Sequence, residues 1–426
     1  MRVPDNLSAL RVRNFRLFAG GQVLSLVGRW MFFTTQDWLV VQLGGHGTAL
    51  GTVVALQFLP ILLLSPYTGV LADRFSKRKI LYVTQTYFSV IAVFAFVTVV
   101  THTATITSVC IQAFLVGLMW SLDTPTRQSF VSEMVGKEHL TNAIAINSVV
   151  FNAARIVGPG LAGLAIAAFG SAPVFGLTAF TQIGVLSSLL RMHPSELQPS
   201  KRVARGKGQV REGLRYVRNR PDLMMPIVLI FIVSAIGLNF PITLALSAKH
   251  FHGGSATYGL LSSTLAVGNL GGALIATRRQ KPRQRTMVLA ALAFGVAECV
   301  TAVMPNLPLF LIALVPMGLA ILTLTTTCNA YVQLGADEQL RGRVMALYLM
   351  VFLGSTPIGA PIVGVICEHW GPQAGLAVGG VASIAAACGT ALWLRRNDPR
   401  RLTGRDRTYG AFEPPQNRVS PMSAVN

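Results

Sequence analysis

Four ionisable side chains stand inside long apolar stretches of this sequence, namely Arg29, Asp37, Arg155 and Glu298. A charge at mid-membrane depth is costly, and by default it faces a cavity or another charge. A cation in such a place can bind an anionic group, and a carboxyl group can take up and release a proton. If the surrounding stretches span a membrane, these residues predict ion binding and coupling within it.

The spacing of these charges limits which of them can pair. Arg29 and Asp37 are eight residues apart, so we expect them on one face of a helix, about 12 Å apart along its axis. Direct pairing is not expected at that separation, although a substrate or a water molecule could bridge the two. Asn152 lies about one turn before Arg155, and Arg155 is expected to face the helix bundle. Arg155 is then either an anchor for an anionic group or a structural partner of Asp37.

The composition places these residues in a membrane protein. Of 426 residues, 52% are hydrophobic and only 12% are charged, whereas soluble domains carry about 25% charged residues. Twelve apolar segments have roughly the 20 residues that an α-helix needs to cross the hydrocarbon core. The first six run over 17–41, 50–72, 80–100, 104–122, 140–169 and 172–190. The second six run over 224–248, 258–276, 287–304, 309–332, 344–366 and 375–394.

The net charge of +20 fits this layout. Lys and Arg accumulate in the cytoplasmic loops of membrane proteins, and 33 of the 36 Lys and Arg residues lie at the termini, in the linker or in every second loop. We therefore expect a multi-pass protein of the cell inner membrane with both termini in the cytoplasm. A nucleic-acid partner is not expected, because no folded polar domain gathers the basic residues.

An internal repeat divides the chain. The segment EHLTNAIAI from Glu138 parallels EQLRGRVMA from Glu338, and GPGLAG from Gly158 parallels GAPIVG from Gly359, each at an offset of roughly 200 residues. Such half-to-half symmetry is typical of secondary transporters. We expect six-helix halves at 1–190 and 223–395 and a basic cytoplasmic linker at 191–222. In the linker an interfacial helix is predicted, with Val210, Leu214 and Val217 on its apolar side. The tail at 396–426 is predicted to be disordered.

The loop after the second segment reads GVLADRFSKRK, from Gly69 to Lys79. It resembles the signature loop of the major facilitator superfamily, although Ser76 stands where glycine is usual. The segments DTPTRQSF from Asp123 and RGRVMALY from Arg341 resemble the branch of enterobactin exporters and macrolide-efflux proteins. The resemblance covers nearly all of the chain. It implies an all-α fold of twelve transmembrane helices in two pseudo-symmetric halves that rock about a central cavity.

The resemblance also implies a cytoplasmic gate. In the family's arrangement Asp73 meets the start of the eleventh helix, while Arg74 and Arg78 reach Asp123 and Arg127 at the end of the fourth. A carboxylate near a helix N-terminus and beside arginine is stabilised by both, so the expected contacts form a latch that closes the inner side. Gly69 belongs to the same motif. The alternative is that these charges only mark the membrane boundary.

Further roles are implied by the same resemblance. The first helix lines the family's central cavity, which would place Arg29 and Asp37 there. The motif with Gly158, Pro159 and Gly163 resembles the antiporter signature, with plain helix packing as the alternative. Glu298 falls in a peripheral helix, so we expect it to be structural more often than coupling. Ala113 occupies the position of the superfamily's usual fourth-helix arginine, which argues against a standard proton relay.

These observations favour a secondary active exporter of an amphipathic small molecule of drug, macrolide or siderophore type, driven by proton antiport. The alternative is a uniporter or importer of a small metabolite on the same fold. An enzyme or an ATP-driven pump is not expected, because the sequence has no phosphate-binding Gly-Lys-Ser or Gly-Lys-Thr loop and its five cysteines lack metal-site spacing. We expect a monomer that has no cofactor, no metal and no catalytic residue. Its partners would be the substrate, protons and the lipid bilayer.

Overall fold

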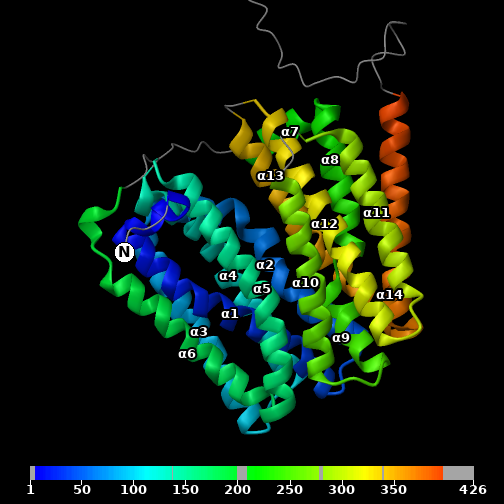
Figure 1. Cartoon of the computed structure of the whole chain (residues 1–426), viewed down its shortest axis with the longest axis horizontal. Helices are drawn as coiled ribbons and strands as arrows, with labels where there is room; N and C mark the ends of the chain where they lie inside the picture. Colours follow the sequence, from blue (N-terminus) through cyan, green and yellow to red (C-terminus); the bar gives the residue numbers. More distant parts are fainter. Residues whose placement is uncertain (1–4, 137, 199–208, 278–281, 338–339, 397–426) are drawn as a thin grey trace, which may run out of the picture.

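The structure is a computed structural model that describes residues 5–136, 138–198, 209–277, 282–337 and 340–396. The side chains at 5, 6, 65, 66, 69, 70, 72, 73, 209–211, 276 and 277 lie outside the description. The predicted disorder of the tail concerns residues that, apart from Arg396, also lie outside it. Helices account for nearly all of the described chain, and they form two bundles that separate toward one end (Figure 1).

The first half holds six long helices after a short 3-10 helix at Asp5–Arg11. These helices are α1 (Arg13–Gln42), α2 (Gly47–Arg74), α3 (Lys77–Val100), α4 (Ile106–Val135), α5 (Leu140–Phe169) and α6 (Ser171–Arg191). Each begins or ends within a few residues of a predicted apolar segment, because length and hydrophobicity set where a chain crosses a membrane.

The second half contains broken crossings. The seventh crossing consists of α8 (Pro221–Ile232), a π-helical turn at Val233–Gly237 and α9 (Phe240–His250). Three continuous crossings follow, α10 (Ser255–Thr277), α11 (Gln284–Ala302) and α12 (Leu307–Gly335). The eleventh crossing begins with α13 (Arg341–Gly354) and continues into α14 (Thr356–Arg396), which turns at Gly371 into the twelfth. Gly371 has φ 84°, a left-handed conformation that glycine adopts without steric cost.

Twelve crossings follow from these helices. Ten stretches of the described residues are long and apolar enough to cross a membrane. The last of them, Arg341–Arg396, contains two crossings, one before Gly371 and one after it. Helix α1 is not among the ten, because it carries Arg29, Asp37 and several amides. Most of α1 is nevertheless buried, so its polar face is covered by protein.

The two halves meet at two symmetric helix–helix crossings, where a helix of one half packs across a helix of the other. Helix α5 crosses α10, where a Cβ added to Gly163 would lie 2.5 Å from the Ser255 carbonyl oxygen and 3.0 Å from Gly259 Cα. Helix α2 crosses α14, where a Cβ on Gly364 would lie 3.2 Å from Gly51 Cα. Gly163 and Gly364 occupy the same place in the internal repeat. Small residues let helix backbones approach this closely, so the repeat builds the same crossing twice.

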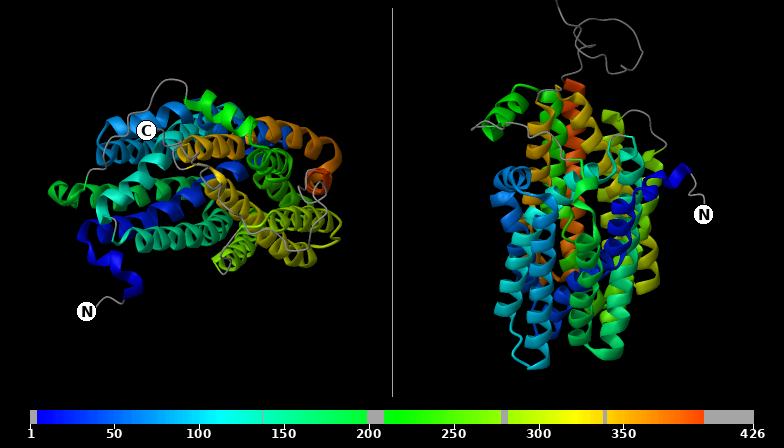
Figure 2. Two further views of the ribbon diagram at one scale, coloured as in Figure 1. Left: turned by 90° about the horizontal axis from the view of Figure 1, so that it is seen from above. Right: turned by 90° about the vertical axis from the view of Figure 1, so that its left-hand side faces the viewer.

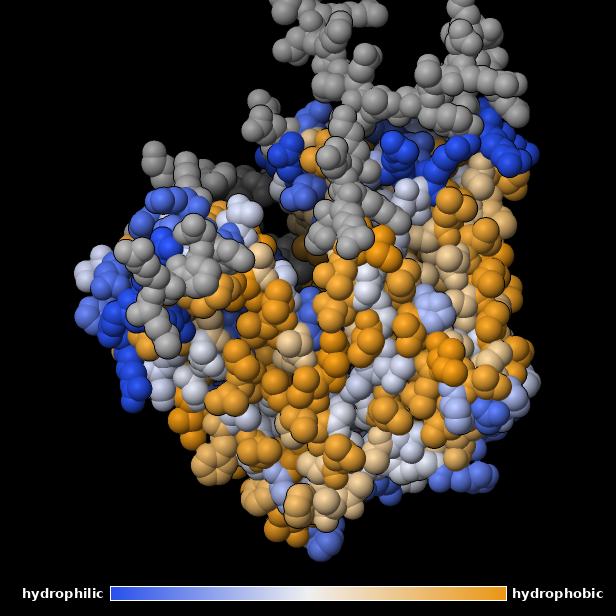
Figure 3. Space-filling view, in the orientation of Figure 1, coloured by the Kyte–Doolittle hydropathy of each residue, from blue (hydrophilic) through white to orange (hydrophobic). Residues whose placement is uncertain are grey.

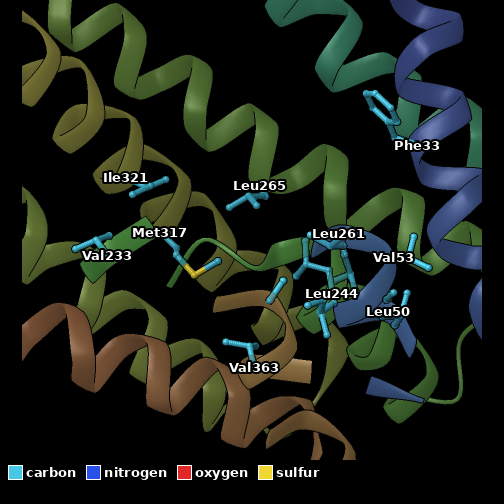
Figure 4. Close-up of a cluster of buried hydrophobic side chains, with 14 of the residues drawn as sticks. Phe33, Leu50, Val53, Val233, Leu244, Leu261, Leu265, Met317, Ile321 and Val363 are labelled. Carbon is cyan, nitrogen blue, oxygen red and sulfur yellow. The ribbon is translucent and has the colours of Figure 1, made fainter. Parts of the chain in front are cut away.

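The apolar core continues from one half into the other. Figure 4 shows part of this cluster, in which Phe33 of α1 and Val53 of α2 lie with Leu244 of α9 and Leu265 of α10. On the face shown in Figure 3 the surface is also largely apolar around the middle of the molecule, with hydrophilic residues concentrated toward its ends. An apolar belt of this kind is what a bilayer solvates.

The linker contains helix α7 (Gln209–Arg218), which packs beside α13 at one end of the bundle (Figure 1). We call this end the linker face and the opposite end the far face. Glu212 forms an ion pair with Arg343 of α13, and the Tyr216 hydroxyl accepts a hydrogen bond of 3.2 Å from the Asp337 backbone N–H. Burial raises the pKa of Tyr216. The helix is thus fastened to the second half, while Leu214 remains exposed.

Candidate functional site

A cavity of about 220 Å³ lies between the two halves. The first half contributes side chains from α1, α2, α4 and α5, and the second half contributes them from the broken seventh crossing and from α10. The lining includes Trp30, Phe33, Thr34, Asp37, Gln57, Phe58, Trp120, Arg155, Pro159, Phe240, Tyr258, Ser262 and Asn269. The halves diverge toward the linker face and approach each other toward the far face (Figure 1), and they lie side by side when seen from above (Figure 2, left).

Asp37 is at the junction of the two halves. It is 6% exposed, and the Tyr258 hydroxyl of α10 donates a hydrogen bond of 2.8 Å to Asp37 Oδ2. The Trp38 ring stacks on the Tyr258 ring with centroids 6.1 Å apart. Among the described residues no Lys, Arg or His forms an ion pair with Asp37. Within the described chain, the Tyr258 hydroxyl is the polar partner that this buried carboxyl has in place of a cation.

Arg155 of α5 also lines the cavity. Its guanidinium carbon lies 5.7 Å from the centroid of the Trp30 ring, and it forms no hydrogen bond or ion pair with any residue in the described part of the chain. The structural pairing of Arg155 with Asp37, one of the two alternatives from the sequence, is therefore not formed. Asn152 donates instead to the Ser148 carbonyl oxygen of its own helix, 2.8 Å away, and does not line the cavity.

Arg29 does not line the cavity, contrary to expectation. It is 5% exposed, and its Nη1 lies 3.2 Å from Asp123 Oδ2 in α4. The reason is helical geometry. Eight residues turn an α-helix by two full turns and about 80° more, so Arg29 points toward α3 and α4 while Asp37 points toward α10. The two residues share a helix but belong to different environments.

Asp123 is the centre of a buried polar network in the first half. It is fully buried and accepts hydrogen bonds from Arg127 one turn later, from Thr84 Oγ1 at 3.0 Å and from Gln85 Nε2 at 2.5 Å, besides Arg29. Two arginines thus share one carboxylate. The network joins α1, α3 and α4, and it is surrounded by protein and not by the cavity.

The contacts expected between the arginines of the signature loop and the end of α4 are not formed in this conformation. Arg78 donates to the carbonyl oxygens of Leu189 at 2.6 Å and Leu190 at 3.1 Å, where the end of α6 leaves backbone acceptors without a helical partner. Asp123 and Arg127 pair with each other, and Arg74 is exposed. The expectation that Arg74 and Arg78 reach Asp123 and Arg127 is therefore wrong for this state. The surroundings of Gly69 and the side chain of Asp73 lie outside the description, so the latch stays a prediction.

The motif in α5 packs helices. A Cβ on Gly158 would lie 2.5 Å from the Trp30 Cβ of α1, and Gly163 makes the crossing with α10 described above. Pro159 lines the cavity. In the second half the equivalent Gly359 meets Ala235 of the π-helical turn. Each copy of the motif therefore packs against the first membrane crossing of its own half, which is α1 in one half and the broken seventh crossing in the other. Each copy also packs across a helix of the opposite half.

Several cavity residues were not singled out in the sequence. Tyr258 begins a predicted apolar segment, and its hydroxyl is the hydrogen-bond partner of Asp37. Asn269 is 2% exposed, and its Nδ2 has no hydrogen-bond partner among the described residues. A polar side chain within an apolar segment was the available signal for both. Glu298 of α11 lies outside the cavity lining and is 1% exposed, with Oε2 unpartnered within the described ranges.

Two pseudo-symmetric six-helix bundles around a central cavity define the chain as a transporter of the major facilitator type. The chain belongs to the transmembrane secretion effector family of that superfamily, whose pattern matches residues 5–415. The resemblance drawn from the signature loop is thereby confirmed.

Curated relatives are transporters. The chain is 23% identical over 373 residues to the staphyloferrin A transporter of Staphylococcus aureus, covering 87% of this chain and 93% of that protein. It is 27% identical over 352 residues to the multidrug efflux pump Tap of Mycolicibacterium fortuitum, covering 79% and 85%. It is also 27% identical over 371 residues to the Tap pump of Mycobacterium tuberculosis, covering 83% and 86%.

Solved structures share the fold. The nucleoside transporter NupG superposes with a TM-score of 0.72 at 12% identity, covering 91% of this chain and 99% of that one. A bacterial homologue of the lysosomal transporter Spinster, solved facing inward, gives a TM-score of 0.67 at 14% identity and covers 92% and 96%. At these identities the likeness concerns the fold alone.

Proposed function

We propose that the protein is a secondary active exporter of an amphipathic small molecule that works by alternating access and proton antiport. The relatives named as multidrug efflux pumps support export. The relative named as a transporter of staphyloferrin A supports an organic small molecule as the substrate. The cavity supports an amphipathic substrate, because its lining combines aromatic rings with a few polar groups. One copy of the chain suffices, since all of these residues come from a single chain.

The observation that carries the proton antiport is the position of Asp37. Its carboxyl lines the cavity and is hydrogen-bonded across the two halves to Tyr258. A proton taken up there removes the charge that the hydroxyl bond stabilises, and so changes the energy of a contact between the halves. Binding of a proton and movement of the halves are then linked, which is the requirement for coupling.

We further propose that the linker face is cytoplasmic and that the described conformation opens toward the cytoplasm. The distribution of Lys and Arg supports this orientation. Among the ion pairs described at the linker face none joins the two halves, since Arg127 pairs with Asp123 within the first half and Arg343 of the second half pairs with Glu212 of the linker. At the far face, by contrast, the Thr48 backbone N–H of the first half donates to Glu368 Oε2 of the second at 2.9 Å.

The test is transport by purified protein in inside-out vesicles, with ethidium and 1-pyrenesulfonate as probes. An acidic lumen should drive uphill uptake of a transported probe by the wild type. Asp37→Asn keeps the size and hydrogen-bonding capacity of the side chain but cannot titrate, so uphill uptake should be lost while downhill exchange remains. Glu196→Gln, an exposed acid in the linker, is the matched control. Normal uphill uptake by the Asn variant would rule out Asp37 as the coupling site.

A further inference from the structure

Resting on the proposed function, we infer that the substrate is an anion with a planar apolar part, bound through its acidic group to Arg155 in the central cavity. The observation is a guanidinium on the cavity wall that no acidic residue of the described chain neutralises. Nothing in the names of the relatives specifies this charge.

The charge balance of the cavity favours an anion. Among the lining residues that the structure describes, Arg155 is the only cation and Asp37 is the only anion. Asp37 is engaged by the Tyr258 hydroxyl and forms no ion pair with Arg155. A guanidinium withdrawn from water is destabilised unless an anion or several acceptors replace its hydration. A carboxylate, sulfonate or phosphate group on a ligand supplies both the negative charge and the hydrogen-bond acceptors. The planar guanidinium group of arginine can bind such a group through two parallel hydrogen bonds.

The walls next to Arg155 favour a planar apolar body. The Trp30 ring lies beneath the guanidinium and meets Phe33 edge to face, with centroids 5.9 Å apart. Phe33 stacks in turn on Trp120 at 5.2 Å, and Phe58 lies 5.6 Å from Trp120. These rings come from α1, α2 and α4, so they form a continuous aromatic wall on the first half. Aromatic ligands pack on such faces with little loss of side-chain entropy.

Two amide side chains supply the remaining polarity. Asn269 Nδ2 of α10 is a buried donor without a partner in the described chain, and Gln57 of α2 lines the same cavity at 6% exposed. A buried donor left unpaired is costly, so a ligand oxygen that reaches Asn269 would be favoured. The cavity thus offers a guanidinium without an acidic partner, an aromatic wall and neutral amides, while its carboxyl group, Asp37, is held by Tyr258. This combination favours an anion over a cation.

The experiment compares two probes that share a ring system and differ in charge. 1-Pyrenesulfonate is a permanent anion, and trimethyl(1-pyrenylmethyl)ammonium is a permanent cation. Binding to the purified full-length protein in detergent is followed by energy transfer to pyrene from the cavity tryptophans, Trp30 and Trp120. The wild type should bind the anion at least tenfold more tightly than the cation. Arg155→Gln should weaken anion binding by roughly tenfold or more, the scale of charge-assisted hydrogen bonds, and leave cation binding unchanged or stronger.

Two variants make the outcome specific. Arg155→Lys keeps the charge without the planar fork, so it should retain part of the preference for the anion. Arg16→Gln removes an exposed arginine from the same protein and should change nothing. Equal binding of the two probes by the wild type, or an unchanged ratio in Arg155→Gln with intact folding, would overturn the inference. Because binding is measured without a proton gradient, this failure is distinct from failure of Asp37→Asn to lose coupling.

Discussion

The Tyr258 hydroxyl donates a hydrogen bond of 2.8 Å to Asp37 Oδ2, and this bond joins α10 of one half to α1 of the other. The two residues lie near the far-face ends of their helices, beyond the aromatic wall of the cavity. This bond is one of the contacts that hold the two halves together in the described conformation. Under the proposed function, protonation of Asp37 would change the strength of that contact.

Replacing Tyr258 by Phe should loosen the far face. The variant keeps the ring that stacks on Trp38 but loses the hydroxyl, and a hydrogen bond to a charged group contributes about 1.5–3 kcal/mol. The population open at the far face should rise accordingly, measured by labelling of a cysteine introduced at Thr34 with an impermeant reagent. Tyr348→Phe is the control, because its hydroxyl bonds to the Thr325 carbonyl within the second half. Equal labelling in both variants would contradict the role given to Tyr258.

Replacing Asp123 by Asn should destabilise the first half strongly. The change leaves Arg29 and Arg127 buried without their shared carboxylate, and breaking a buried ion pair in this way costs about 3–5 kcal/mol. Thermal unfolding in detergent should show a large fall in Tm. A second change, Arg127→Gln, should restore part of it. Asp222→Asn, which breaks a partly exposed pair with Arg220, should cost only about 0–1 kcal/mol. Similar losses in the Asp123 and Asp222 variants would mean that the network contributes little.

Adding a methyl group at Gly259 should impair the α5–α10 crossing. A Cβ there would collide with the Pro159 carbonyl oxygen and lie 3.0 Å from Gly163 Cα. Overpacking of this kind costs about 1–3 kcal/mol, so Tm and transport should both fall. Gly271→Ala is a control on the same helix, because its nearest contact would be 3.7 Å away. By the repeat, Gly51→Ala should behave like Gly259→Ala. The symmetric role of the crossings fails if Gly51→Ala behaves like the control.

Replacing Glu298 by Met should separate a structural role from a coupling role. The carboxyl is buried between Gly237 and Gly379, with Oε2 unpartnered among the residues described. A flexible apolar side chain of similar size removes a buried polar group whose desolvation costs about 1–3 kcal/mol. We expect equal or higher Tm and normal uphill transport. Loss of uphill transport without loss of Tm would show that Glu298 takes part in coupling.

The sequence predicts the fold well, because hydrophobic length and loop charge are local properties. It predicts side-chain partners less well, because they depend on how a helix is rotated. The 80° offset between Arg29 and Asp37 is an example, since it follows from the helical period, yet which neighbour each residue meets is decided by packing. Tyr258 lies 221 residues from Asp37 in the chain, and no local pattern connects them. The break at Val233–Gly237 was likewise hidden inside a continuous apolar segment.

The polarity of α1 has a consequence for how the chain enters the membrane. A charged residue at the centre of a lone helix raises the free energy of insertion by about 2.5–3.5 kcal/mol. Helix α1 carries two charged residues, Arg29 and Asp37, and is not among the stretches that are apolar enough by themselves to cross a membrane. Arg29 gains its carboxylate only when α4 is present, and Asp37 gains its hydroxyl donor only when α10 is present. Helix α1 therefore obtains these two partners only from helices synthesised after it, and its insertion should be completed by them.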